Sequence, residues 1–280
     1  MADPLVPNSC GASNGSGPWP DDPVERAAAV AATGLRRPVA AGAPAALAAL
    51  VADDPDGRVR AAALGALARL PDPPPGGLPP SVAPAVPGGS LRASAWLRAA
   101  ADTDPAVRRR AADLAPAFAR PSDNRRSSGT PPVPQERRID LPTDPALNRR
   151  SSRTPPVPQE RRIVEVLVEL LGDGDAAVAE AAAWALGEVG DGGAVPHLTT
   201  TATAHRDPLV REAAVAALGA IGDPGGLDAV LAACADKPAI RRRAVLALAA
   251  FEGPAVDAAL QAALTDKDWQ TRQAAEDLLN

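Results

Sequence analysis

Residues 207–219 read DPLVREAAVAALG, and variants of this phrase recur along the chain. The related copies centre, in the place that Val210 holds here, on Val59, Val107, Val178, Ile240 and Thr271. From Val178 onward the centres are 32, 30 and 31 residues apart, which is the period of a helix-turn-helix repeat. Each copy except that at Ile240 opens with Asp, often followed by Pro, as a helix N-cap and first turn do. The phrase therefore predicts one helix per copy.

Shorter apolar segments lie between the copies and predict a second set of helices. They begin near Pro44, Leu91, Val164, Ala194, Gly226 and Pro254. A single helical pair cannot bury its apolar face, so neighbouring pairs must stack to form a continuous core. The sequence thus predicts an all-α fold, an α-solenoid that coils as a superhelix.

Composition limits the function classes. Of 280 residues 46% are hydrophobic, yet only 2% are aromatic, so the helices must pack closely. The net charge of −5 argues against nucleic acid or an anionic membrane as the main target. Only Cys10 and Cys234 are present, which predicts no disulfide framework and favours the cytoplasm. The chain has no stretch of about 18 consecutive apolar residues, so the sequence predicts no membrane span. The excess of Arg over Lys suggests a GC-rich bacterial genome.

The repeated phrase resembles the HEAT-like repeats of the phycobilisome-lyase type, well over residues 164–280 and loosely over 24–120. The resemblance implies a ladder in which the loop Asp and the Arg after the apolar centre bond between neighbouring repeats. The matching residues are Asp56 with Arg60, Asp104 with Arg108, Asp207 with Arg211, and Asp268 with Arg272. The ladder is expected to break twice, because Lys237 replaces the Asp before Arg241 and Ala179 replaces an Arg.

Two insertions interrupt the repeats. The 48 residues from Val59 to Val107 include a Pro-rich loop at 71–90, and the next 71 include a duplication of residues 124–139 as 148–163. Linker 121–163 carries a net charge of +4, which leaves −9 for the remaining chain. We expect tail 1–22 and residues 121–158 of this Pro/Arg-rich linker to be disordered, with repeats at 23–120 and 164–280. The second PQERRI, at 158–163, runs on into VEVLVELL and can start a helix. A spacer is favoured over a polyproline ligand or phosphorylation at Ser128 and Ser152.

The second helix of each pair predicts a binding surface. With the Val210 position as zero, positions 0, +4 and +8 point to the packed side, and positions +2, +3 and +6 point away from it. These outward positions should line the concave face. The predicted partner-binding residues are Arg109, Arg110, Glu180, Trp184, Glu212, Arg242, Arg243, Gln273 and Asp277. Trp and Arg dominate interface energetics, which favours a partner-binding role for this surface. The alternative is that Trp184 packs against its neighbouring repeat and the charged side chains are only solvated.

Enzymatic relatives of this repeat offer a second reading. The resemblance to deoxyhypusine hydroxylase implies a di-iron site from His-Glu pairs at +2 and +3, where this chain has Glu180-Ala181, Glu212-Ala213 and Arg242-Arg243. His197 and His205 are the only histidines, too few for such a site. For a bilin-lyase role, the sequence offers no compact motif that would hold a tetrapyrrole. We therefore expect no catalytic residues, no metal and no cofactor.

Nucleic-acid binding is a third reading, by resemblance to HEAT-like DNA glycosylases. Arg108–Arg110 and Arg241–Arg243 could contact phosphate, but Asp113, Glu180, Glu212 and Asp277 share the face and oppose it. The sequence thus favours a non-catalytic scaffold that binds an unidentified protein or peptide. It leaves open the oligomeric state and whether the two repeat blocks form one solenoid.

Overall fold

The computed structural model describes residues 19–35, 42–70, 90–119 and 158–279, and these residues form helices without any strand. The first helix of each pair, here the A helix, is α2 (Ala43–Asp53), α4 (Leu91–Ala100), α6 (Pro158–Leu170), α8 (Val195–Ala204), α10 (Leu227–Ala233) and α12 (Pro254–Ala263). The second, or B, helices are α3 (Gly57–Ala68), α5 (Pro105–Ala119), α7 (Ala176–Val189), α9 (Pro208–Ile221), α11 (Pro238–Ala247) and α13 (Trp269–Leu279).

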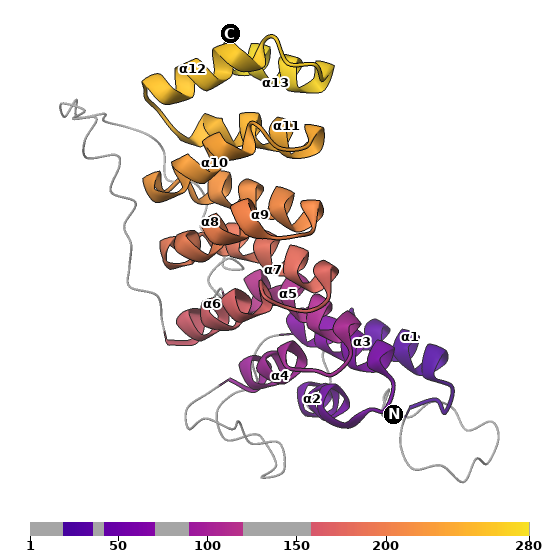
Figure 1. Cartoon of the computed structure of the whole chain (residues 1–280). Coiled ribbons are helices and arrows are strands. Elements are labelled where there is room, and N and C mark those ends of the chain that lie inside the picture. The colour runs from indigo at the N-terminus through magenta and orange to yellow at the C-terminus, as the bar shows by residue number, and fades with distance from the viewer. Residues whose placement is uncertain (1–18, 36–41, 71–89, 120–157, 280) are drawn as a thin grey trace, which may run out of the picture.

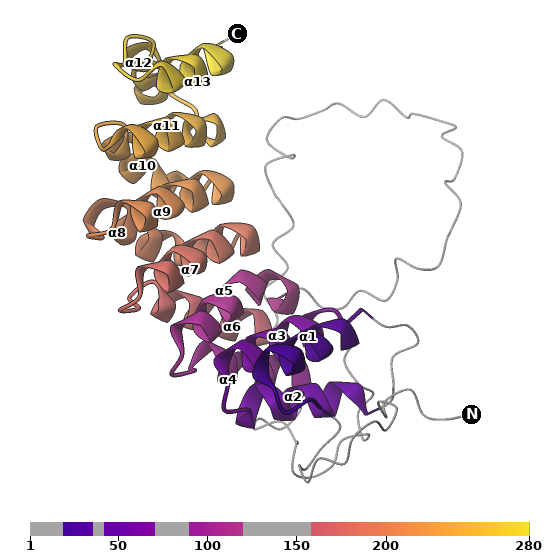
Figure 2. The same cartoon turned by 90° about the vertical axis from the view of Figure 1, so that its right-hand side faces the viewer.

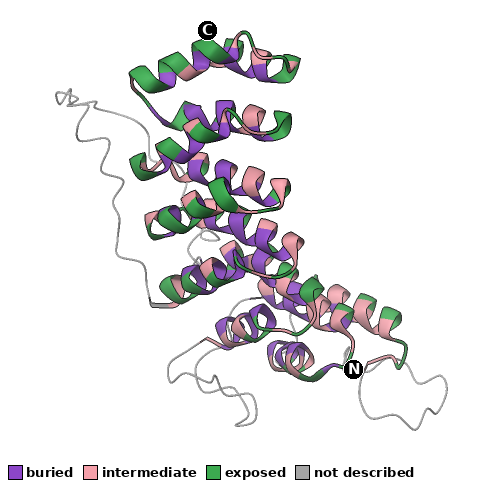
Figure 3. Cartoon of the chain, in the orientation of Figure 1, coloured by how far each residue is buried: buried purple, intermediate pink, exposed green. Residues whose placement is uncertain are grey.

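The A/B pairs stack in chain order, with the A helices on one side and the B helices on the other (Figures 1 and 2). Between them runs one core of buried aliphatic side chains and alanines, seen as the purple inner faces in Figure 3. The predicted all-α solenoid is thereby confirmed.

Helix α1 (Pro23–Thr33) is a B helix that the sequence analysis did not recognise as a copy of the repeat. It packs on α3, and its N-cap Asp22 accepts hydrogen bonds from the backbone N–H groups of Val24 and Glu25. Its repeat centre is Glu25 instead of an apolar residue, which explains why the pattern missed it.

The two repeat blocks form one stack. Helix α5 packs against both α6 and α7, and the Gln159 side chain donates to the Phe118 carbonyl at 3.0 Å. Helix α6 begins at Pro158 and buries Ile163 to 1% exposure. The end of the duplicated segment, residues 158–163, thus forms the first turns of a helix, as its continuation into VEVLVELL indicates. Residues 1–18, 71–89 and 120–157, on which the predictions of a tail, a loop and a disordered linker fall, lie outside the described residues.

An Asp–Arg ladder joins the repeats, but its aspartates are not the predicted ones. Each rung runs from the Arg after the repeat centre to an Asp in the loop before the next repeat. This Asp stands two residues before the N-cap position, except that Asp236 stands one residue before N-cap Lys237. The rungs are Arg26–Asp54, Arg60–Asp102, Arg108–Asp173, Arg211–Asp236 and Arg241–Asp266, with N–O distances of 2.7–2.9 Å. The prediction that Arg241 lacks a partner is wrong.

The aspartates predicted for the ladder act as helix caps. Asp104 accepts from the N–H of Ala106 at 2.9 Å and Asp207 from that of Leu209 at 2.8 Å. Asp56 and Asp268 cap their helices in the same way. The cap and the rung need separate carboxylates because the cap must point back at its own helix, whereas the rung must reach the preceding repeat.

The ladder lacks a rung between α7 and α9. Ala179 stands where the Arg would be, as the sequence predicted, and His205 stands where the Asp would be. His205 keeps one role of that Asp, since its Nδ1 accepts from the Asp207 N–H at 3.1 Å, as Asp173 Oδ1 accepts from the Asp175 N–H at 2.9 Å. Because both the Arg and the Asp of this rung are replaced, no single charge is left without its partner in a partly buried site.

The ladder makes the solenoid sensitive to acid. Hydrogen bonds from Arg108, Arg211 and Arg241 hold the pKa values of Asp173, Asp236 and Asp266 below their ordinary value of 3.8. A carboxylate whose pKa is lower in the folded state contributes stability that is fully present above the unfolded-state pKa.

We therefore expect the free energy of unfolding to fall as the pH drops below about 4 and through the depressed pKa values. Urea unfolding at a series of pH values measures this. The Arg108→Ala variant is the control, because without its rung the loss on acidification should be smaller. An equal loss in that variant would contradict the assignment.

Candidate functional site

The solenoid bends toward the side of its B helices (Figure 1). Residues at +2, +3 and +6 of these helices, here called the concave row, lie on that side. All nine predicted partner-binding residues are exposed or half-buried. The alanines that share the +3 position, Ala181, Ala213 and Ala274, are buried. The row is thus a surface of charged, amide and aromatic side chains set between small residues.

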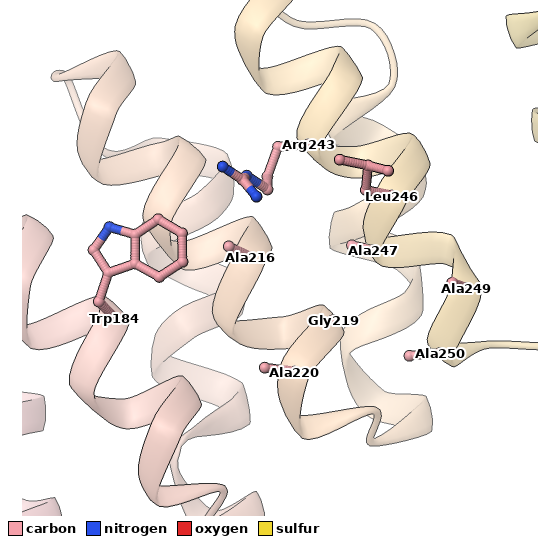
Figure 4. A pocket seen from close by; sticks show the side chains of 9 residues that line it. All are labelled: Trp184, Ala216, Gly219, Ala220, Arg243, Leu246, Ala247, Ala249 and Ala250. Carbon is pink, nitrogen blue, oxygen red and sulfur yellow. The ribbon is translucent and has the colours of Figure 1, made fainter. Parts of the chain in front are cut away.

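A groove of about 390 Å³ opens on the concave row across α7, α9 and α11 (Figure 4). Trp184 of α7 stands on one side of it and Arg243 and Leu246 of α11 on the other. Its floor consists of small residues: Ala216, Gly219, Ala220, Ala247, Ala249 and Ala250. The last two belong to the 3-10 turn η4 (Leu248–Ala250). The lining is therefore apolar apart from one guanidinium group.

Trp184 and Arg243 interact across this groove. The Arg243 guanidinium carbon lies 5.4 Å from the Trp184 ring centroid, within cation–π range. The same guanidinium bonds Glu212 at 3.4 Å. Trp184 nevertheless remains 41% exposed. The indole is thus held in place by neighbouring repeats and also presented to solvent, which combines the two alternatives that the sequence left open.

The groove floor is shallow because α9 and α11 approach closely. A Cβ built on Gly219 would lie only 2.6 Å from the Ala247 Cβ and 2.8 Å from its Cα. Of the floor residues, Ala216 is at an outward +6 position, but the others lie beyond +6 and sequence reasoning missed them. The small residues Ala216, Gly219 and Ala220 were the available signal.

The remaining predicted residues do not join this groove. The Arg110 side chain lies against Gly65 of α3, where an added Cβ would be 3.1 Å from the Arg110 Nη2. Arg242 bonds Gln270. Gln273 bonds Asp277 of its own helix at 2.9 Å. Polar stretches of the concave row therefore lie on either side of the apolar groove.

The basic clusters proposed for nucleic acid are divided by the fold. Arg108 and Arg241 belong to ladder rungs, with Nε–O distances of 2.7 and 2.8 Å to Asp173 and Asp266. Arg243 is engaged with Glu212. Each cluster of three thus presents only two of its arginines to the concave row.

The two histidines lie apart from the concave row. His197 is exposed on α8, an A helix, and His205 is in the loop before α9. Within the described ranges, no group of three or more His, Cys, Asp or Glu side chains converges as metal ligands do. Nor does any helix there have the length and apolar character needed to cross a membrane.

Family comparison agrees with this architecture. Residues 196–280 match the model for HEAT repeats, and residues 163–192 match that for the single HEAT repeat. The chain is a HEAT-like repeat protein. The match is to HEAT repeats in general, so the lyase-type resemblance and the bacterial source stay predictions. Comparison with curated protein sequences finds no match.

Three solved structures resemble the chain at low sequence identity. An engineered protein is 22% identical over 91% of this HEAT-like chain, with a TM-score of 0.49, and this chain spans 63% of its length. A designed armadillo repeat protein is 14% identical over 85% of this chain and 99% of its own, with a TM-score of 0.44. Human deoxyhypusine hydroxylase in complex with glycerol is 22% identical over 92% of this chain and 79% of its own, with a TM-score of 0.38.

Proposed function

We propose that this HEAT-like protein is a non-catalytic scaffold that binds a protein or peptide partner in the groove around Trp184. The observation that carries the proposal is the exposed indole, held by Arg243 above a floor of small residues. Exposed aromatic side chains that are rigid before binding lose little entropy on association, and Trp and Arg are the most frequent interface hot spots.

The shape of the groove favours a macromolecular partner over a small substrate. It is open along α7, α9 and α11, and Trp184 and Leu246 on its two sides are 41% and 44% exposed. Small-molecule sites usually enclose most of the ligand and supply several convergent polar groups. Here the lining supplies one guanidinium, already bonded to Glu212.

Charge supports a protein partner over nucleic acid. Glu180 and Glu212 lie on the concave row beside the groove, and they would repel phosphates. The surface around the groove is mixed in charge, as the polar rim of a protein interface is.

Truncation of Trp184 should weaken partner binding. We expect Trp184→Ala to raise the dissociation constant about thirtyfold, because a central hot spot contributes roughly 2 kcal/mol or more. Affinity capture from a bacterial lysate compares the wild-type chain with a triple variant, Trp184→Ala, Arg242→Glu, Arg243→Glu. The partner is the protein that the wild type captures and the triple variant does not. Surface plasmon resonance with the purified partner then gives the dissociation constant for Trp184→Ala alone.

The matched control is His197→Ala, an exposed residue on the A-helix side, which should leave partner binding unchanged. Metal content and nucleic acid are assayed on the same samples. Equal capture by all variants, or stoichiometric iron or nucleic acid in place of a protein, would refute the proposal.

A further inference from the structure

One stripe of every B helix faces the following repeat. It consists of the residues at −2, +1, +5 and +8 from the repeat centre, here called the stacking stripe, and position +1 is the ladder Arg. A Cβ on Gly57, at −2 in α3, would collide with the Asp104 carboxylate of the next repeat. Leu218, at +8 in α9, lies against Gly226 at the start of α10. The stripe is therefore the surface that one repeat offers to the next.

In five consecutive repeats the +5 and +8 positions of the B helix, or of the η4 turn that continues α11, are apolar and no more than 1% exposed. The pairs are Leu64 and Leu67, Ala112 and Ala115, Ala183 and Leu186, Val215 and Leu218, and Val245 and Leu248. Position −2 is always small or Pro: Gly57, Pro105, Ala176, Pro208 and Pro238. Small residues leave room there for the loop of the next repeat.

Helix α13 departs from this pattern. Its stacking stripe reads Trp269, Arg272, Glu276 and Leu279, and Trp269 and Leu279 are 64% and 40% exposed. Figure 2 shows α12 and α13 at one end of the stack. An indole at −2 obstructs the place of a following loop, and Glu276 replaces the apolar +5 residue. The stripe is therefore not adapted to another repeat of the kind found inside the chain.

Arg272 retains half of a ladder rung. Its Nη1 donates to the carbonyl oxygens of Asp266 and Lys267 at 2.7 and 3.3 Å, just as Arg108 binds Asp102 and Thr103. The other ladder arginines add a carboxylate from the next repeat, but within the described residues Arg272 has none. The stripe thus offers a positioned guanidinium between two exposed apolar side chains.

We propose that this stripe is a homodimer interface, in which α13 packs antiparallel against α13 of a second copy about a two-fold axis. The stripe is self-complementary in that arrangement. Residues 272 and 276 are symmetric about Ala274, and so are residues 269 and 279. One register therefore places Arg272 opposite Glu276 and Trp269 opposite Leu279 of the second copy, as an isologous interface requires. The carboxylate of Glu276 completes the rung across the axis.

This interface is separate from the Trp184 groove and does not depend on the proposed function. Two-fold pairing at the end of the stack leaves the concave row of each copy accessible. A dimer of this kind would present two grooves, so a partner with two binding segments would gain avidity without new contacts.

A charge exchange tests the register. Sedimentation velocity of the full chain is run at roughly 1–200 µM, which brackets micromolar dissociation constants. Arg272→Glu alone and Glu276→Arg alone each place like charges opposite one another and should raise the dimer dissociation constant at least about tenfold. The double exchange Arg272→Glu, Glu276→Arg should restore dimerisation, and this recovery also excludes misfolding as the cause of the single-variant loss.

A matched pair of tryptophan variants locates the interface. Trp269→Ala should weaken the dimer, whereas Trp184→Ala should not. Any of three results would overturn the proposal. The wild-type chain could stay monomeric at every concentration, the single charge variants could dimerise like the wild type, or the double exchange could fail to restore the dimer. A dimer that depends on Trp184 instead of Trp269 would also overturn it, because it would assign self-association to the groove.

Discussion

Replacing Arg108 by alanine is expected to lower the free energy of unfolding by about 2–3 kcal/mol, close to the cost of breaking a buried ion pair. The pair that Arg108 forms with Asp173 is well shielded, with side-chain exposures of 19% and 9%. Two parallel bonds of 2.7 and 2.9 Å join the guanidinium to the carboxylate. Alanine at this position leaves Asp173 partly buried without its counter-charge.

The change should also alter the cooperativity of unfolding. Arg108 and Asp173 connect the repeats on either side of residues 120–157, and contacts of α4 with α6 and of α5 with α6 and α7 also link them. Repeat arrays are stabilised by nearest-neighbour interfaces, so weakening one interface lets the two sides unfold separately. We expect urea unfolding followed by circular dichroism to change from one transition toward two.

Arg58→Ala is the control for this prediction. Arg58 also bonds an aspartate, Asp56, at 2.7 Å, but its side chain is 64% exposed. Exposed pairs contribute little to stability, so this variant should unfold like the wild type. If Arg108→Ala behaved like Arg58→Ala, the ladder would not couple the repeats.

Sequence reasoning predicted the repeated elements well because they depend on local chemistry. Asp207 caps its helix, and Val210 and Leu218 are buried, as the phrase at 207–219 indicates. Position +6 was correctly expected to point outward, and Trp184 at that position is exposed. The 3.6-residue period carries this information within a single helix.

Contacts between repeats were harder to predict because most of the loops contain two candidate aspartates. Asp102 and Asp104 differ by only two residues, and the one nearer the helix was wrongly assigned to the ladder. Choosing between them requires the loop path that turns Asp102 toward the preceding repeat. The groove floor was missed for a similar reason, since its depth depends on how closely α9 and α11 approach.

Because α9 and α11 approach so closely, we expect Gly219→Ala to change the free energy of unfolding strongly. Alanine in the interior of a helix is normally more stable than glycine by about 1 kcal/mol. Here the new Cβ would lie 2.6 Å from the Ala247 Cβ and 2.8 Å from the Ala247 Cα. The second of these neighbours is backbone, so α11 must move. Overpacking of this kind costs about 1–3 kcal/mol, and we expect the free energy of unfolding to fall despite the gain in helix propensity.

Gly65→Ala is the matched control, also within a B helix. The atoms nearest to a Cβ built on Gly65 belong to the Arg110 guanidinium, with Nη2 at 3.1 Å, and a flexible side chain can move aside. This variant should be at least as stable as the wild type in urea unfolding. Adding Ala247→Gly to Gly219→Ala removes the 2.6 Å contact but not the 2.8 Å contact with the Cα, so the pair should show partial rescue. Equal gains in stability from Gly219→Ala and Gly65→Ala would mean that α9 and α11 separate at little cost. The groove floor would then be an adjustable surface that a partner could deepen on binding.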